Sequence, residues 1–115
     1  MKQKNSKRQK NEDVIILNNV RFEWDDKKNE ANMQKHKISF IEAMTVFDDD
    51  NALYKPDIDH SQDEERFIIL GISKNLRLLV VCHCYRESET VIRIISARKA
   101  TKQEWNQYGG ELYEG

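Results

Sequence analysis

The chain has 115 residues, 34% of them charged, with a formal net charge of −1 at pH 7. That length suffices for one domain with a modest core and leaves no room for a separate regulatory module. No apolar run approaches the roughly 20 residues needed to span a bilayer, and the basic N-terminus lacks the apolar stretch of a secretory signal. We therefore expect a cytoplasmic protein without membrane contact.

Charge is segregated along the chain. Residues 48–65 carry eight Asp or Glu against a single Lys, whereas residues 66–102 carry eight Lys or Arg against two Glu. The C-terminal half of the fold should therefore be basic and suited to a polyanion such as RNA. Scattered solvated lysines would give the same count.

The N-terminal region divides into a tail and a β segment. Residues 1–11 hold no apolar residue beyond the initiator, which predicts a disordered basic tail or an expression remnant ahead of a single domain at 12–115. Residues 14–17 and 20–24 are β-branched or aromatic runs on either side of Asn18-Asn19. This pattern is typical of a short hairpin or of one bent strand.

A first helix is predicted from Asp25 or Asp26 to about residue 35, because acids begin this segment and bases end it. One face of the helix is polar, and it carries Lys28, Asn32 and Lys35 with His36 at its margin. This face is either solvated or a contact surface for RNA.

A second helix should begin at Ser39, which forms a capping box with Glu42. Its apolar stripe predicts packing on a sheet; the stripe is Phe40, Ala43, Met44 and Phe47. Two helices joined by a short turn suggest a DNA-binding helix-turn-helix. The second helix has no Lys or Arg, however, which argues against a DNA-reading role.

The rest of the chain is mostly β structure. A short strand at 52–54 and a polar loop at 57–61 precede strands at 67–72, 76–85 and 91–97. Thr101 and Glu104 form another capping box, which opens a terminal helix ending near Gly109-Gly110. The order predicts an α+β fold with a mostly antiparallel sheet, two N-terminal helices and a C-terminal helix.

The hairpin of the last two strands carries basic residues inside apolar runs. If its turn centres on Ser88, His83 lies directly opposite Arg93, with Arg98 on the other face. An imidazole beside a permanent cation on rigid strands can hold and cleave a phosphodiester. Alternatively, both are edge residues that face solvent.

Neither a disulfide nor a metal site is expected. Cys82 and Cys84 are separated by one residue on a single strand, so a bond between them would distort the strand, and we interpret them as reduced core thiols. The three histidines occupy separate elements and offer no spacing typical of zinc.

Between residues 22 and 104, a series of short motifs follows a recognisable order and spacing: Phe22-Glu23-Trp24-Asp25, Asn32, Lys35-His36, Ser39-Phe40, Glu42-Ala43, Val46-Phe47-Asp48, Asp59-His60-Ser61, Glu65-Arg66, 77–81 and 93–101. In these residues the chain resembles the BrnT family, the toxins of a type II toxin-antitoxin pair, with a RelE-like ribonuclease fold. Lys37 departs from the pattern, because the family usually has glycine there. The left-handed backbone conformation is less favourable for lysine than for glycine, so we expect the join between the helices to differ slightly from the family's.

The resemblance implies a metal-independent endoribonuclease that cuts RNA and inhibits translation, without a cofactor. It also implies a BrnA-like antitoxin that neutralises the toxin, with DNA contacted only indirectly through their complex. RNA cleavage of this kind needs a base for the 2′-OH proton, cations for the phosphorane and an acid for the 5′ oxygen. The histidines are natural acid and base candidates, although RelE-like nucleases often use Lys and Arg.

We therefore take as candidate catalytic residues Arg77, His83, Arg93, Arg98 and His60, and as candidate RNA-binding residues Lys28, Lys35, His36 and Arg66. Structural alternatives exist for several of them. His60 is also a plausible turn residue, His36 can cap the first helix, and Glu65 can pair with Arg66. The alternative function is a non-catalytic module that binds RNA or protein through the same basic sheet.

Overall fold

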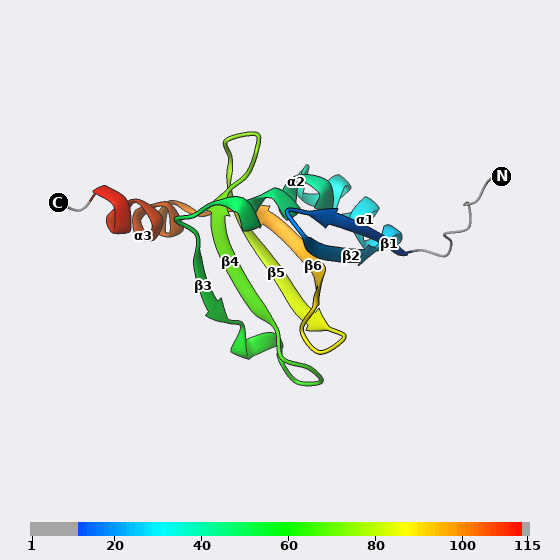
Figure 1. The fold of residues 1–115 in the computed structure, drawn as a ribbon. Coiled ribbons are helices and arrows are strands. Elements are labelled where there is room, and N and C mark those ends of the chain that lie inside the picture. The colour runs from blue at the N-terminus through cyan, green and yellow to red at the C-terminus, as the bar shows by residue number, and fades with distance from the viewer. Residues whose placement is uncertain (1–11, 114–115) are drawn as a thin grey trace.

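One mixed sheet organises the protein. The computed structural model describes residues 12–113, so the predicted tail at 1–11 lies outside it (Figure 1). The elements are β1 (Glu12–Leu17), β2 (Val20–Asp25), α1 (Asp26–His36), α2 (Phe40–Met44), η2 (Thr45–Asp48), β3 (Leu53–Pro56), η3 (Ile58–His60), β4 (Phe67–Ile72), β5 (Leu78–Arg86), β6 (Val91–Lys99) and α3 (Lys102–Tyr113). No helix of these residues is long and apolar enough to cross a membrane.

The strand order is β1-β2-β6-β5-β4-β3, and every neighbouring pair is antiparallel except β2 and β6. This confirms the predicted α+β class with a mostly antiparallel sheet. α1 and α2 lie beside the β2–β6 end of the sheet, whereas α3 extends away beyond the β3–β4 end (Figure 1).

The chain opens with a hairpin, which settles the choice between a hairpin and one bent strand. Asn18 and Asn19 both have positive φ, 52° and 69°. Two successive left-handed residues make the tight turn whose twist suits a two-residue hairpin, and asparagine tolerates that conformation. The register places Phe22 opposite Ile15, with Phe22 and Trp24 buried in the core.

α1 is tied to the sheet by one amide side chain. Asn32 is only 6% exposed. It donates to the carbonyl oxygens of Ile38 and Ala97 at 2.9 Å each and accepts from the Ala97 N–H at 3.1 Å. Because β2 pairs with β6 only at Val91–Arg93, Asn32 takes the place of a neighbouring strand further along β6. The solvated interpretation of this helix face is therefore wrong for Asn32.

Lys37 ends α1 in the left-handed conformation that the family's glycine suits. Its φ is 63° and its ψ is 32°, and its N–H donates to the Met33 carbonyl oxygen. The backbone therefore makes the turn despite the lysine, at a conformational cost of about 1 kcal/mol.

We expect Lys37→Gly to raise the free energy of unfolding by about 0.5–1 kcal/mol, since glycine adopts this φ without strain. Lys35→Gly, two residues earlier in the last turn of α1, should lower it by about 1 kcal/mol because glycine weakens a helix. Urea denaturation of both variants checks this. If Lys37→Gly lost as much stability as Lys35→Gly, the claim that the backbone of Lys37 is strained would be wrong.

α2 and η2 supply the main core on one face of the sheet. The Ser39 hydroxyl oxygen accepts from the Glu42 N–H at 3.1 Å, as the capping box predicts, but the Glu42 carboxylate points elsewhere. The side chains of this helix pack with those of β2, β4, β5 and β6; the core residues are Phe22, Trp24, Ile38, Phe40, Ala43, Met44, Val46, Ile69, Leu79, Val81, Ile94 and Ala97. We call this side of the sheet the helical face.

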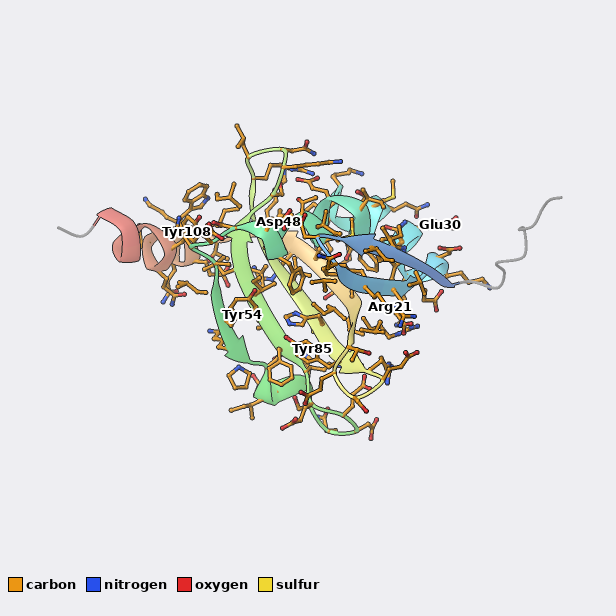
Figure 2. All side chains as sticks on the ribbon, in the orientation of Figure 1. Arg21, Glu30, Asp48, Tyr54, Tyr85 and Tyr108 are labelled. Carbon is orange, nitrogen blue, oxygen red and sulfur yellow. The ribbon has the colours of Figure 1, made fainter. Side chains whose placement is uncertain are left out.

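A smaller cluster on the opposite face anchors α3. Tyr108 packs with Leu70, Leu78 and Val80, and its hydroxyl donates to Asp49 Oδ2 at 2.6 Å. Figure 2 shows Tyr108 at the end of the sheet from which α3 leaves.

The capping box that opens α3 is reciprocal, as predicted. The Thr101 hydroxyl accepts from the Glu104 N–H, and Glu104 accepts from the Thr101 N–H. The predicted end near Gly109-Gly110 is wrong, because the helix continues to Tyr113. Glycine weakens a helix but ends it only when its φ becomes positive, and no described glycine has a positive φ.

The predicted register of the β5–β6 hairpin is also wrong. Pairing runs from Arg86 opposite Val91 to His83 opposite Ile94, and then shifts by one residue, so that Val81 lies opposite Ala97. A β-bulge on β6 makes the shift, because two residues there oppose one on β5. His83 therefore faces Ile94, and Arg93 faces Cys84 on the other side of the sheet. Sequence alone does not reveal a bulge in a run of apolar residues.

Candidate functional site

A cavity of about 220 Å³ lies beside β4, β5 and β6, where side chains of the face opposite the helical face line it. Its lining comes from the end of α1, the β3–β4 connection and these strands; the residues are His36, Asp57, His60, Arg66, Ile68, Val80, Cys82, Ile95, Ser96, Ala97 and Arg98. Four residues predicted from sequence are thereby brought together: His36, His60, Arg66 and Arg98.

His60 is held by a carboxylate. Its Nδ1 lies 3.1 Å from each oxygen of Asp57, three residues earlier in the same 3-10 turn. The Asp57 side chain is only 12% exposed, whereas that of His60 is 67% exposed. A buried carboxylate on Nδ1 orients the ring and leaves Nε2 to exchange a proton with a ligand. His60 is thus a residue of a 3-10 turn that also lines the cavity.

Hydrogen bonds join the two ends of the loop that carries His60 and Arg66. The Asp57 N–H donates to the Arg66 carbonyl oxygen at 2.8 Å. Ser61 bridges the same two residues, since its hydroxyl donates to the Asp57 carbonyl oxygen and accepts from the Arg66 N–H. These bonds fix the backbone of His60 relative to that of Arg66.

The two arginines of the cavity differ in their partners. Arg98 is held by both oxygens of Glu104, at 2.9 Å each. Arg66 has only the looser contact of its Nε with Glu64, at 3.6 Å, and this buried Nε has no hydrogen-bond partner. A pairing of Arg66 with Glu65 was one alternative from the sequence, but the partner is Glu64. Arg66 is therefore the guanidinium better able to bind an added anion.

The Cys82 thiol belongs to the structure rather than to the chemistry of the cavity. Burial and the nearby Asp57 carboxylate raise its pKa to about 11, and its Sγ donates to Asp57 Oδ2 at 3.6 Å. A thiol with so high a pKa stays protonated near neutral pH and is a poor nucleophile. Cys82 and Cys84 are both free, as predicted.

Of the three basic candidates on α1, one lines the cavity and two do not. His36 ends α1 and lines the same cavity as His60 and Arg66. Lys28 and Lys35 are exposed on the same helix and do not line the cavity.

Arg77 stabilises the fold rather than lining the cavity. Its Nε donates to Glu42 Oε2 at 2.9 Å, and its Nη2 donates to Glu42 Oε1 and to the Lys37 carbonyl oxygen. Ser73 donates to the same carboxylate at 2.6 Å. Chiefly through Arg77, these contacts lower the pKa of Glu42 to about 2.

His83 and Arg93 also lie outside the cavity. His83 is fully buried on the helical face, where its ring packs against those of Phe47, Phe67 and Tyr85. Figure 2 shows Tyr85 on β5, on the part of the sheet away from the helices. Arg93 Nη1 binds Glu23 Oε2 at 2.7 Å, with both side chains 14% exposed. The predicted His83–Arg93 pair does not exist.

A family model and a solved structure are both similar to this chain. Residues 24–104 match the family model described as the ribonuclease toxin, BrnT, of a type II toxin-antitoxin system. The chain belongs to the BrnT family. The fold is similar to that of the Brucella abortus ribonuclease toxin BrnT, with a TM-score of 0.53 and 22% identity over 69% of this chain and 94% of that one. No curated protein matches the sequence.

In this BrnT-family protein, sequence reasoning missed the residues that support the site. Asp57 was assigned only to a polar loop, although its position three residues before His60 is the spacing at which one turn brings two side chains together. Ser61 and Glu104 were noted for other reasons. Their bonds to Arg66 and Arg98 depend on tertiary packing, which no local spacing indicates.

The buried His83 should make this BrnT-family toxin less stable in mild acid. Burial lowers its pKa to about 4 from the ordinary 6.5. The unfolded chain therefore binds the proton more tightly, so stability is full above about pH 6.5 and falls by up to about 3 kcal/mol as the pH drops to 4. Urea denaturation at pH 7 and at pH 4.5 measures this loss.

The matched variant is His83→Phe, which keeps a ring among Phe47 and Phe67 but does not titrate. It should lose clearly less stability than the native protein between the two pH values. An equal loss in both proteins would show that other groups control the acid response.

Proposed function

We propose that this BrnT-family toxin is a metal-independent endoribonuclease whose catalytic site is the cavity formed by α1, the β3–β4 connection and β4 to β6. One observation carries the proposal: the cavity combines His60, oriented by Asp57, with His36 and Arg66. Two imidazoles and a guanidinium can supply the base, the acid and the cation that RNA cleavage through the 2′-OH needs.

His60 is proposed as the general base. With Nδ1 directed at the Asp57 carboxylate, Nε2 accepts the proton of a 2′-OH. The 2′ oxygen then attacks the adjacent phosphorus and forms the bond of a 2′,3′-cyclic phosphate. Asp57 stabilises the imidazolium that results, as an orienting carboxylate does in other acid–base sites.

His36 is proposed as the general acid, and Arg66 as the main phosphate ligand. As the bond from phosphorus to the 5′ oxygen breaks, His36 gives that oxygen a proton. Arg66 stabilises the charge on the phosphorane, because its guanidinium matches two phosphate oxygens. Arg98 also lines the cavity but already binds Glu104.

The proposed mechanism needs no metal ion, because its base, acid and cation are all protein side chains. Among residues 12–113, no group of three or more His, Cys, Asp and Glu is placed to hold a metal ion. The proposed base, acid and cation are His60, His36 and Arg66, and together they complete the transfer of the phosphorus from the 5′ oxygen to the 2′ oxygen.

The biological role follows from the family. We propose that cutting RNA inhibits translation in the cytoplasm, that the fold is RelE-like, and that a BrnA-like antitoxin neutralises the toxin. DNA contact would then be indirect, through the antitoxin complex. Membership in a type II toxin-antitoxin family supports a protein antitoxin as partner.

The first test is incubation of the purified protein with a structured RNA in EDTA and, in parallel, in Mg²⁺. We expect cleavage in both. Intact RNA that remains bound to the folded protein would instead favour a non-catalytic RNA-binding module. Cleavage that is lost in EDTA would overturn the metal-independent mechanism.

A further inference from the structure

The two edges of the sheet differ in how they are protected. An edge strand offers unpaired backbone groups to another strand, and proteins commonly block it with proline or lysine. The β3 edge ends in Lys55-Pro56. β1 has neither residue in Glu12–Leu17, and no strand of residues 12–113 pairs with its outer side.

The exposed side chains of β1 are apolar. Val14 is 51% exposed and Ile16 is 66% exposed. They lie opposite Glu23 and Arg21 in the hairpin, and thus on the face opposite the helical face. Among residues 12–113 the strand therefore offers both hydrogen-bonding groups without a neighbouring strand and apolar surface, which are what an added strand would bury.

We propose that β1 pairs with β1 of a second copy of this chain, in an antiparallel register centred on Ile15. In this register Val14 of each copy lies opposite Ile16 of the other, because cross-strand partners keep a constant number sum. All four exposed side chains then lie on one face and contact each other across the interface.

The strand fits its own copy well. The register places Asp13 opposite Leu17 of the second copy, so the acidic beginnings of the two strands lie apart rather than opposite one another. If β1 of one copy paired with β3 of another, the pairing would continue into an open fibre. Lys55-Pro56 at the end of β3 opposes this arrangement. The two-fold pairing closes after two copies.

The dimer would extend the sheet through both copies. An antiparallel two-fold pairing keeps equivalent faces on the same side, because its axis is perpendicular to the sheet. Both cavities would therefore open towards the same side. β1 precedes residues 24–104, which match the family model, so this interface belongs to a part of the chain outside that match. It does not depend on the proposed ribonuclease activity.

Sedimentation velocity of the full chain at about 10–200 µM tests the proposal. We expect a dimer for the native protein and a monomer for the double variant V14K/I16K, since two lysines per strand would face lysines of the second copy. Ile41→Lys, on the exposed side of α2 at 38% exposure, should leave the dimer intact. A native protein that stays monomeric throughout, or an Ile41→Lys variant that is monomeric, would overturn it.

Single cysteine variants under mild oxidation test the register of the β1–β1 pairing and leave the edge strand intact. Ile15→Cys should cross-link to itself, because the two residues at the axis have Cα atoms about 5 Å apart. Val14→Cys lies away from the axis and should cross-link far less. A stronger cross-link in Val14→Cys, or a native protein that cross-links equally well through Cys82 or Cys84, would contradict this register.

Discussion

His60→Ala is expected to reduce the rate of RNA cleavage by about 10²- to 10⁴-fold, the usual contribution of a positioned acid–base group. The melting temperature should change little, because the side chain is 67% exposed and its main contact is the Asp57 carboxylate. The measurements are single-turnover cleavage of an RNA oligonucleotide and thermal unfolding of the same preparation.

Asp57→Asn distinguishes an oriented base from a merely nearby imidazole. The amide keeps the size of the carboxylate but cannot stabilise an imidazolium, so cleavage should fall in the same direction as in His60→Ala. Lys74→Ala, in the exposed loop after β4, is the control and should keep native activity. Native rates in both His60→Ala and Asp57→Asn would exclude this cavity as the catalytic site.

Arg77→Ala is expected to lower the free energy of unfolding by about 2–4 kcal/mol, because it leaves a buried carboxylate without its cation. Glu42 is 4% exposed and would keep Ser73 as a partner. The sequence predicted Arg77 to be a catalytic residue, and loss of an exposed catalytic arginine would affect stability far less. Urea denaturation at neutral pH measures the loss.

The dependence of stability on acidic pH distinguishes the loss of the Arg77–Glu42 ion pair from other causes of instability. The hydrogen bond from Arg77 lowers the pKa of Glu42 to about 2 from its ordinary value of 4.5. Stability from the pair is therefore present above about pH 4.5 and is lost as the pH falls towards 2. Arg77→Ala should lack that part of the acid dependence.

Arg66→Ala is the matched arginine variant. It should lower cleavage by about 10²-fold or more, because it removes the proposed phosphate ligand, while changing the unfolding free energy by less than about 1 kcal/mol. If Arg77→Ala remained as stable as the native protein and Arg66→Ala unfolded, the assignment of the two residues would be reversed.

Much of the fold was predictable, because local signals decide it. Asn18-Asn19 marks the first turn, Ser39 caps α2, and Thr101 with Glu104 opens α3. Each acts through neighbours within a few residues, so spacing in the sequence reveals it. The bulge on β6 and the continuation of α3 beyond Gly109 depend on packing, which spacing does not reveal.

The site was predictable only as a set of residue types. Histidine and arginine were the right chemical candidates, and His36, His60, Arg66 and Arg98 do meet in one cavity. Which histidine is buried follows from the alternation of β5, whose odd-numbered residues Leu79, Val81 and His83 share the core face. Arg77 could not be recognised as structural, because its partner Glu42 is 35 residues away.

The chemistry of the cut ends tests the proposed mechanism most directly. An RNA oligonucleotide with one cleavage position is incubated with the protein in EDTA, beside the same oligonucleotide with a 2′-deoxy residue at that position. Attack by the 2′-OH gives a 2′,3′-cyclic phosphate and a 5′-hydroxyl, and leaves the deoxy substrate intact. A 5′-phosphate on the product, or cleavage of the deoxy substrate, would contradict a cavity in which His60 removes the 2′ proton.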